Sequence, residues 1–180
     1  MSPAHELDLG PLTWVKGEID LALERATDAL AEAGTAPDRP GRIKFAQTHL
    51  HQAHGALSIV GLDGLTQFSD QLDRLLGDLA GERLPCTPDT IRLATRCIAA
   101  IGNYLDELSR GQPDQALRLF GLYTELAVAR GHEAPTPGEL FFPDTSRRPV
   151  FAAPAETGDD PKRLRALRGR FERGLLKWFR

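Results

Sequence analysis

The stretch AQTHLHQAHGALSIVG, residues Ala46–Gly61, combines the periodicity of a helix with a cluster of histidines. On a helical wheel of about 100° per residue, the apolar side chains of the segment 42–60 fall on one side. These residues are Ile43, Ala46, Leu50, Ala53, Leu57 and Val60. The pattern predicts a long amphipathic helix whose apolar face packs against other helices.

The same periodicity recurs on both sides of this segment. It predicts further helices over 11–33, 65–79, 88–109 and 114–129. Two of these starts carry helix signals, because Pro11 and Pro88 suit a first helical turn and Thr87 suits an N-cap. No segment alternates with period two for long enough to indicate a strand. We therefore predict an all-α fold, an antiparallel helical bundle.

The chain changes character after residue 130. Residues 131–160 contain five prolines, which predicts an extended connector, and its GELFFPD motif (138–144) is a candidate for docking on the bundle. A final helix is predicted over 161–179, with one apolar face made of Leu164, Leu167, Phe171, Leu175 and Trp178. The predicted domains are a helical bundle over 1–130, a Pro-rich connector over 131–160 and a basic amphipathic helix over 161–180.

Charge is distributed unevenly along the chain. The whole chain carries −3 and the last twenty residues carry +7, which leaves −10 for residues 1–160. An acidic body with a basic tail is not typical of a nucleic-acid-binding domain, so we expect no nucleic-acid partner. For the helix at 161–180, packing against the bundle or a partner is favoured over contact with a membrane surface.

The sequence predicts a cytoplasmic location. No apolar run is long enough to span a bilayer, and the start of the chain has neither the basic residues nor the apolar stretch of a secretory signal. The two cysteines, Cys86 and Cys97, form no CxxC pair, which disfavours a disulfide framework.

Three histidines of the segment 42–60 point in different directions on the wheel. His51 lies about 120° from the centre of the apolar face and is predicted to be exposed, whereas His49 and His54 lie at opposite boundaries of that face. His51 and His54 are three residues apart and could share an ion, but His49 does not converge with them and the helix offers no nearby carboxylate. We therefore expect no metal site and treat His49 and His54 as residues with ordinary packing or a hydrogen bond.

Gly55 follows His51 by one turn on the same exposed face. A glycine inside a helix costs about 0.5–1 kcal/mol relative to alanine, which suggests that another body approaches closely there. Because helical side chains lean toward the N-terminus, a bulky residue at 55 would crowd the imidazole of His51. An open imidazole suits a nucleophile that a second protein must reach. The alternative is a solvated histidine with an incidental glycine. Lys44 and Thr48 on this face, with Gln52, form a candidate docking surface.

The segment His51-Gln52-Ala53-His54-Gly55-Ala56 resembles the phosphotransfer signature His-x-x-Lys-Gly-Ser, in which the histidine is phosphorylated. With the blocks LGPLTWVKGEID, GELFFPD and RGLLKWFR, the chain resembles the N-terminal phosphotransfer-like domain of ChpA/PilL-type chemotaxis hybrid histidine kinases. Those kinases govern type IV pili and twitching motility. The chain departs from the signature at His54, which replaces lysine and is cationic only when protonated, and at Ala56, which replaces serine.

The resemblance implies a two-component signalling module of histidine-phosphotransfer type. In this interpretation the module docks a response-regulator receiver and relays a phosphoryl group through His51. It has no kinase domain and no cofactor of its own, because Mg²⁺ belongs to the receiver. Downstream domains of a hybrid kinase are a second class of partner. The alternative is a phosphorylation-silent scaffold that binds a regulator or a pilus-associated protein. An enzyme acting on a small molecule has little support, because phosphate loops, paired catalytic carboxylates and nucleophile elbows are missing.

Overall fold

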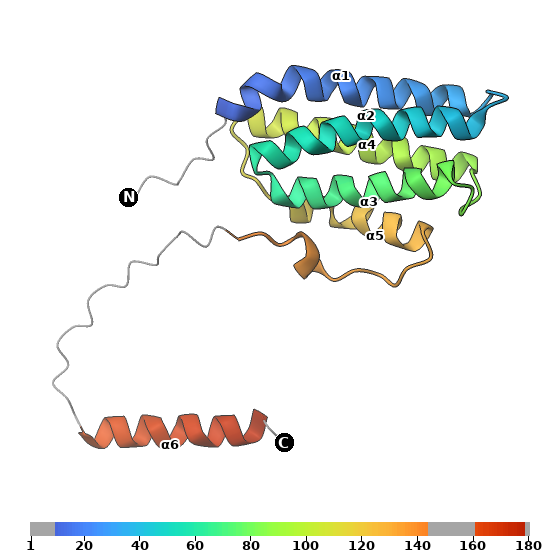
Figure 1. The fold of residues 1–180 in the computed structure, drawn as a ribbon. Helices are drawn as coiled ribbons and strands as arrows, with labels where there is room; N and C mark the ends of the chain where they lie inside the picture. Colours follow the sequence, from blue (N-terminus) through green and yellow to red (C-terminus); the bar gives the residue numbers. More distant parts are fainter. Residues whose placement is uncertain (1–9, 144–160, 179–180) are drawn as a thin grey trace. The chain divides into compact units, whose positions relative to one another are not determined.

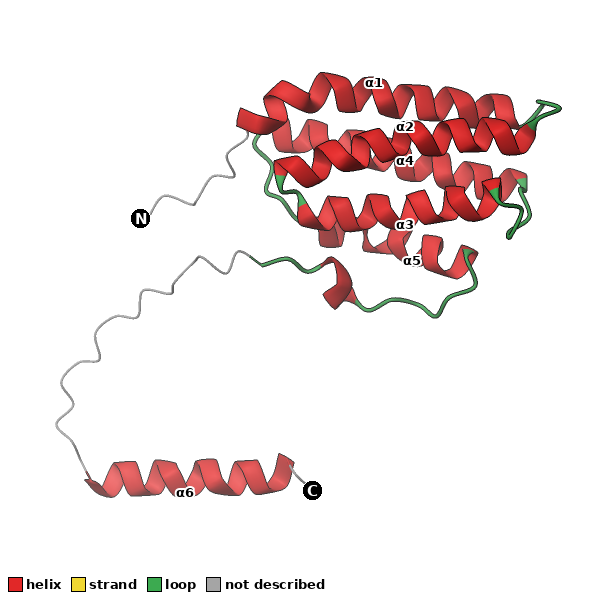
Figure 2. Cartoon of the chain, in the orientation of Figure 1, coloured by secondary structure: helices red, strands yellow, loops and turns green. Residues whose placement is uncertain are grey.

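The computed structural model describes residues 10–143 and 161–178, which form helices joined by loops (Figures 1 and 2). The α-helices are α1 (Gly10–Ala33), α2 (Arg39–Val60), α3 (Asp63–Ala80), α4 (Pro88–Ser109), α5 (Phe120–Ala129) and α6 (Pro161–Trp178). Two short 3₁₀ helices, η1 (Ala116–Leu119) and η2 (Pro137–Leu140), flank α5. The described residues contain no strand, and the predicted all-α helical bundle is confirmed.

Helices α1 to α4 pack side by side, and α5 lies against α3 (Figure 1). Short connections reverse the chain between successive helices, as expected for an antiparallel bundle. The buried leucines, isoleucines and alanines of these helices form one continuous core. Five of the six residues predicted for the core face of α2 are fully buried, and Val60 at its end is partly buried.

Helix α2 begins three residues earlier than predicted. The carboxylate of Asp38 accepts a hydrogen bond from the backbone N–H of Gly41 at 3.0 Å and caps the helix, and Pro40 fits the first turn. At the other end Gly61 has φ +80°, a left-handed conformation that favours glycine and closes the helix. The helix that carries the histidines is therefore fixed at both ends.

Helix α4 begins as predicted, with Thr87 as N-cap and Pro88 in the first turn. The predicted start of α5 at Asp114 is wrong. The phenol of Tyr104 donates to the carboxylate of Asp114 and accepts from the backbone N–H of Gln115 at 2.6 Å. These two bonds tie the segment to α4, with Gln115 extended at φ −141°, so helical structure starts only at Ala116.

The first compact unit of the chain extends to Pro143. Within it, Leu140 is buried, and Phe142 lies against Gly64 on α3, its Cδ2 only 3.3 Å from where a Cβ on that glycine would stand. The phenol of Tyr123 also donates to Glu139 Oε2 at 3.3 Å. The expected docking of the GELFFPD motif is therefore seen for Glu139, Leu140 and Phe142.

Helix α6 belongs to a second unit, residues 144–180. It forms as predicted over its described length, and its apolar side chains Leu164, Leu167 and Phe171 are exposed. Residues 144–160 of the predicted connector, Phe179 and the side chain of Trp178 lie outside the described residues. Within the described ranges, no helix is long and apolar enough to cross a membrane.

Candidate functional site

The outer face of α2 presents His51 to solvent. The His51 side chain is 74% exposed, in agreement with the wheel. One turn later Gly55 is exposed, and no described heavy atom outside its own stretch of helix lies within 4 Å of where its Cβ would stand. The imidazole therefore has open space on the side from which a partner would approach.

A carboxylate of α3 stands behind His51. Asp73 Oδ1 lies 3.9 Å from His51 Nδ1. Gln47 holds this carboxylate in place, since its Nε2 donates to Asp73 Oδ2 and to the Asp73 backbone carbonyl, each at 3.2 Å. The remaining oxygen, Oδ1, is buried and has no hydrogen-bond partner among the described residues. A proton on His51 Nδ1 would face this oxygen, which leaves Nε2 as the nitrogen with a free lone pair.

His54 lies at the boundary between α2 and α3, as predicted. Its ring is partly buried, and its Nδ1 is 2.8 Å from the hydroxyl of Ser69 on α3. The rings of His51 and His54 are nearly parallel, with an interplanar angle of 19° and centroids 5.9 Å apart. The structure thus brings both histidines of the motif together, each with a polar neighbour on α3.

The three residues proposed for docking lie on the same outer face. Lys44 donates to Gln47 Oε1 at 2.9 Å, and the hydroxyl of Thr48 donates to the Lys44 carbonyl at 3.0 Å. Gln52 is exposed between them and Gly55. Two large apolar side chains flank this polar strip, Phe45 and Ile59, and Ile59 is 81% exposed. Phe45 and Ile59 therefore add apolar area that a docked partner would remove from water.

The comparison with protein families decides the class of this site. The model of the Hpt domain matches residues 12–111, more than half of the chain, and this range includes α2, α3 and α4. The chain belongs to the Hpt domain family. Hpt domains are histidine phosphotransfer modules, so the protein takes part in two-component phosphorelay signalling through a histidine. Neither the curated proteins nor the solved structures gave a match.

Membership of the Hpt family confirms the histidine-phosphotransfer part of the resemblance. Hpt domains interact with response-regulator receivers, so the family indicates a receiver as the class of partner. The ChpA/PilL type and the role of each site residue stay predictions.

His49 is more deeply buried in the Hpt domain than the wheel predicts. It is only 8% exposed, and its ring meets the Phe45 ring edge-on with centroids 4.5 Å apart. Its Nδ1 lies 3.1 Å from Gln52 Oε1, while its buried Nε2 has no partner among the described residues. The edge-on contact with Phe45, one turn earlier on the same helix, adds burial that the apolar stripe alone does not predict. In the described part of the chain no group of three or more histidines, cysteines, aspartates or glutamates could hold a metal ion.

Sequence reasoning missed Asp73 and Ser69. Both belong to α3, and a wheel drawn for α2 carries no information about the residues that another helix brings to its side. On α3 both fall beside the apolar stripe, where boundary residues normally pack without a special role. Their spacing of four residues, which places them on one helical face, was the only signal available.

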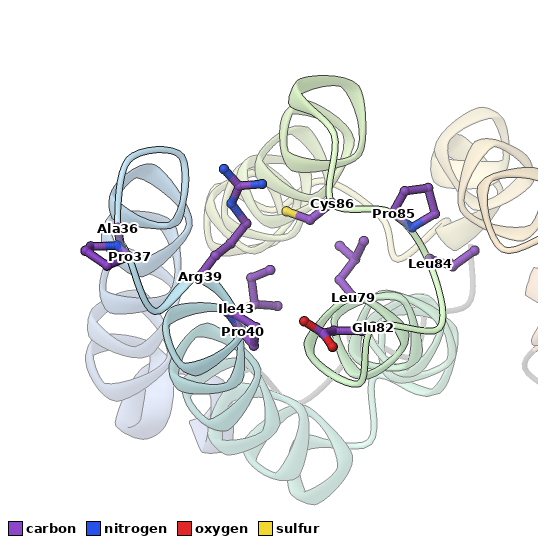
Figure 3. Close-up of a pocket in the computed structure, with 10 residues that line it drawn as sticks. All are labelled: Ala36, Pro37, Arg39, Pro40, Ile43, Leu79, Glu82, Leu84, Pro85 and Cys86. Atoms are coloured by element: carbon purple, nitrogen blue, oxygen red, sulfur yellow. The ribbon is translucent and has the colours of Figure 1, made fainter.

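A hollow of about 440 Å³ lies at the N-terminal end of α2, between the α1–α2 and α3–α4 connections (Figure 3). Arg39, Glu82 and Cys86 line it together with apolar residues. Arg39 is engaged with the backbone, because its Nε donates to the Ala33 carbonyl at 3.1 Å. Burial raises the pKa of the Cys86 thiol, so this cysteine remains a poor nucleophile. The hollow lies about three helical turns from His51 and takes no part in the histidine site.

Proposed function

We propose that this Hpt domain carries a phosphoryl group on His51 and exchanges it with a response-regulator receiver docked on the outer face of α2. The observation that carries the proposal is the exposed imidazole of His51, which has open space at Gly55 on one side and the Asp73 carboxylate on the other. An exposed histidine with a carboxylate behind one nitrogen is arranged to react through the other nitrogen.

The transfer step uses His51 of this chain and the aspartyl phosphate of the receiver. The lone pair of His51 Nε2 attacks the phosphorus of the receiver's aspartyl phosphate, the P–Nε2 bond forms, and the P–O bond to the receiver's aspartate breaks. The aspartate leaves as a carboxylate, and Nδ1 keeps its proton. The phosphorylated imidazole is then cationic, and the Asp73 carboxylate, 3.9 Å from Nδ1, stabilises that charge. The reverse steps return the phosphoryl group. Mg²⁺ would be held by the receiver.

The docking surface is formed by Lys44, Thr48 and Gln52 with the apolar side chains Phe45 and Ile59. Lys44 complements the acidic phosphorylation site of a receiver, and the two apolar groups supply area that loses contact with water on binding. The resemblance to ChpA/PilL-type kinases supports a role in type IV pilus control. It also supports downstream hybrid-kinase domains as further partners.

A scaffold that binds a regulator without accepting phosphate is the second candidate. Two departures from the signature favour it, His54 in place of lysine and Ala56 in place of serine. The scaffold would use the same outer face of α2, so binding alone does not separate the two functions.

The two functions separate when transfer and binding are measured on the same variants. Wild type should gain acid-labile, base-stable label from a phosphorylated receiver of its own organism, and His51→Gln should lose the label while its Kd for the receiver changes less than about twofold. His132→Gln, at an exposed loop histidine, is the matched control and should behave as wild type. A wild-type protein that binds receivers but stays unlabelled with all of them would establish the scaffold instead.

A further inference from the structure

His54 makes a hydrogen-bonded chain with two residues of α3. Its Nδ1 lies 2.8 Å from Ser69 Oγ, and Ser69 Oγ donates to the backbone carbonyl of Thr66 at 2.9 Å. The Ser69 side chain is fully buried. The hydroxyl therefore has these two groups as its neighbours within hydrogen-bonding distance among the described residues.

The chain fixes the position of the proton on neutral His54. A hydroxyl has one proton, and the Thr66 carbonyl can only accept, so the Ser69 proton belongs to that bond. Ser69 Oγ then accepts from His54, which requires the proton of His54 to be on Nδ1. In the reverse arrangement two oxygens would face each other at 2.9 Å with no proton between them.

This tautomer decides which nitrogen of His54 can accept a second proton. Nε2 carries the lone pair when the ring is neutral, and it takes up the second proton when the ring becomes cationic. The Ser69 bond survives in both states, because Nδ1 remains a donor. The ring can thus gain a charge without moving, while it lies 5.9 Å from the ring of His51 and nearly parallel to it.

We propose, building on the phosphotransfer function above, that Ser69 positions His54 with its proton on Nδ1. Protonation of His54 Nε2 then stabilises a phosphoryl group carried by His51. The dianionic phosphoryl group is attracted to a neighbouring imidazolium and not to a neutral ring. The domain therefore retains phosphate more strongly when His54 is protonated.

Other charged groups near the pair also respond to pH. On α3, Asp73 lies behind His51, and Asp70 is paired with Arg74 at 2.9 Å. On α2 the nearest titratable neighbour is His51 itself, whose protonation removes the attacking lone pair. These influences are common to wild type and to variants at His54, so the ratio of wild type to variant isolates the contribution of His54.

The first test reads the tautomer directly. Long-range ¹H–¹⁵N spectra of the imidazoles at about pH 8.5, where an ordinary histidine is neutral, distinguish a proton on Nδ1 from one on Nε2. Wild type should show Nδ1–H for His54, and Ser69→Ala should shift the population toward Nε2–H. A dominant Nε2–H form in the wild-type domain would overturn the assignment.

The second test measures the labelled fraction of the domain at equilibrium with a phosphorylated receiver, from about pH 8 to about pH 6. The ratio of wild type to His54→Gln should rise roughly fivefold over this range, because only wild type gains a charge at this position. His54→Lys, cationic throughout, should keep a high labelled fraction at pH 8. A constant ratio would overturn the role of His54 while leaving transfer through His51 intact. Absence of label from wild type at every pH would overturn the phosphotransfer function itself, and the NMR test would still decide the tautomer.

Discussion

Two histidines of α2, His49 and His51, are only two residues apart and have opposite surroundings. His49 is 8% exposed, with its ring against Phe45. His51 faces the α3 side, 74% exposed, with a buried carboxylate oxygen behind it. Since successive helical residues are rotated by about 100°, two positions place the side chains on nearly opposite sides.

The difference shows that the surroundings of each histidine decide what it can do. Two side chains of α2 itself, the ring of Phe45 and the amide of Gln52, lie against His49, and its Nε2 is buried. On the α3 side, Asp73 and Ser69 supply polar contacts while leaving His51 open. A reactive histidine therefore needs a neighbour that orients it and a free path for the partner.

The largest expected effect is on the free energy of unfolding, and it compares a substitution on the buried side of α2 with one on its exposed side. Leu50, between the two histidines, is fully buried, and Leu50→Ala should lower the free energy of unfolding by about 2–5 kcal/mol. His51→Gln should change it by less than about 0.5 kcal/mol, because the side chain is exposed. Urea unfolding monitored by circular dichroism measures both. Comparable destabilisation by the two changes would mean that His51 has a structural role.

Gly55→Leu, on the exposed side of α2, should weaken receiver binding without lowering the stability of the fold. Leucine improves helix propensity by up to about 1 kcal/mol, and a Cβ at position 55 has no described atom outside its own stretch of helix within 4 Å, so thermal stability should rise slightly. The same side chain would occupy the space beside His51, and the Kd for the receiver should increase at least tenfold, about 1.4 kcal/mol.

The control for this change is Gly121→Leu, at an equally open glycine on α5. It should leave the Kd unchanged. If Gly55→Leu bound the receiver as tightly as wild type, partner approach would not pass over position 55, and the glycine would need another explanation.

Apolar periodicity predicts the fold well because each helix has a continuous buried stripe. Leu50, Ala53 and Leu57 fall where the wheel puts them, and Thr87 with Pro88 marks the start of α4 through backbone chemistry that is local in sequence. Asp38 was missed as a cap because Pro37, Pro40 and Gly41 make its surroundings read as a loop. Its capping bond to Gly41 is visible only once the helix has been built.

The candidate site is less predictable from sequence because half of it comes from another helix. The exposure of His51 and the open space at Gly55 follow from the geometry of α2 alone. The contacts of Asp73 with His51, of Ser69 with His54 and of Tyr104 with Asp114 depend on how the helices pack. Periodicity identifies the inner and outer faces of a helix, but it does not identify the residue that faces each side chain across an interface.

Asp73→Asn tests whether the contrast between His49 and His51 depends on the contact of Asp73 with His51. Asparagine keeps the size of the side chain and can still accept the bond from Gln47, so folding should be nearly unchanged. The negative charge behind His51 Nδ1 is lost, and with it the stabilisation of the cationic phosphoimidazole. We expect the maximal rate of transfer from a phosphorylated receiver to fall about threefold to tenfold, while the receiver concentration at half-maximal rate stays the same.

This division between rate and binding distinguishes a positioning role from a structural one. A carboxylate that only held α3 against α2 would, when replaced, alter unfolding and docking together with transfer. Asp70→Asn removes a carboxylate from the same helix at a position paired with Arg74, and should therefore leave the transfer rate within about twofold of wild type. If Asp73→Asn transferred phosphate at the wild-type rate, the 3.9 Å approach of Asp73 to His51 would be incidental. The proposed phosphotransfer would then depend on the exposure of His51 and the open space at Gly55, without a contribution from α3.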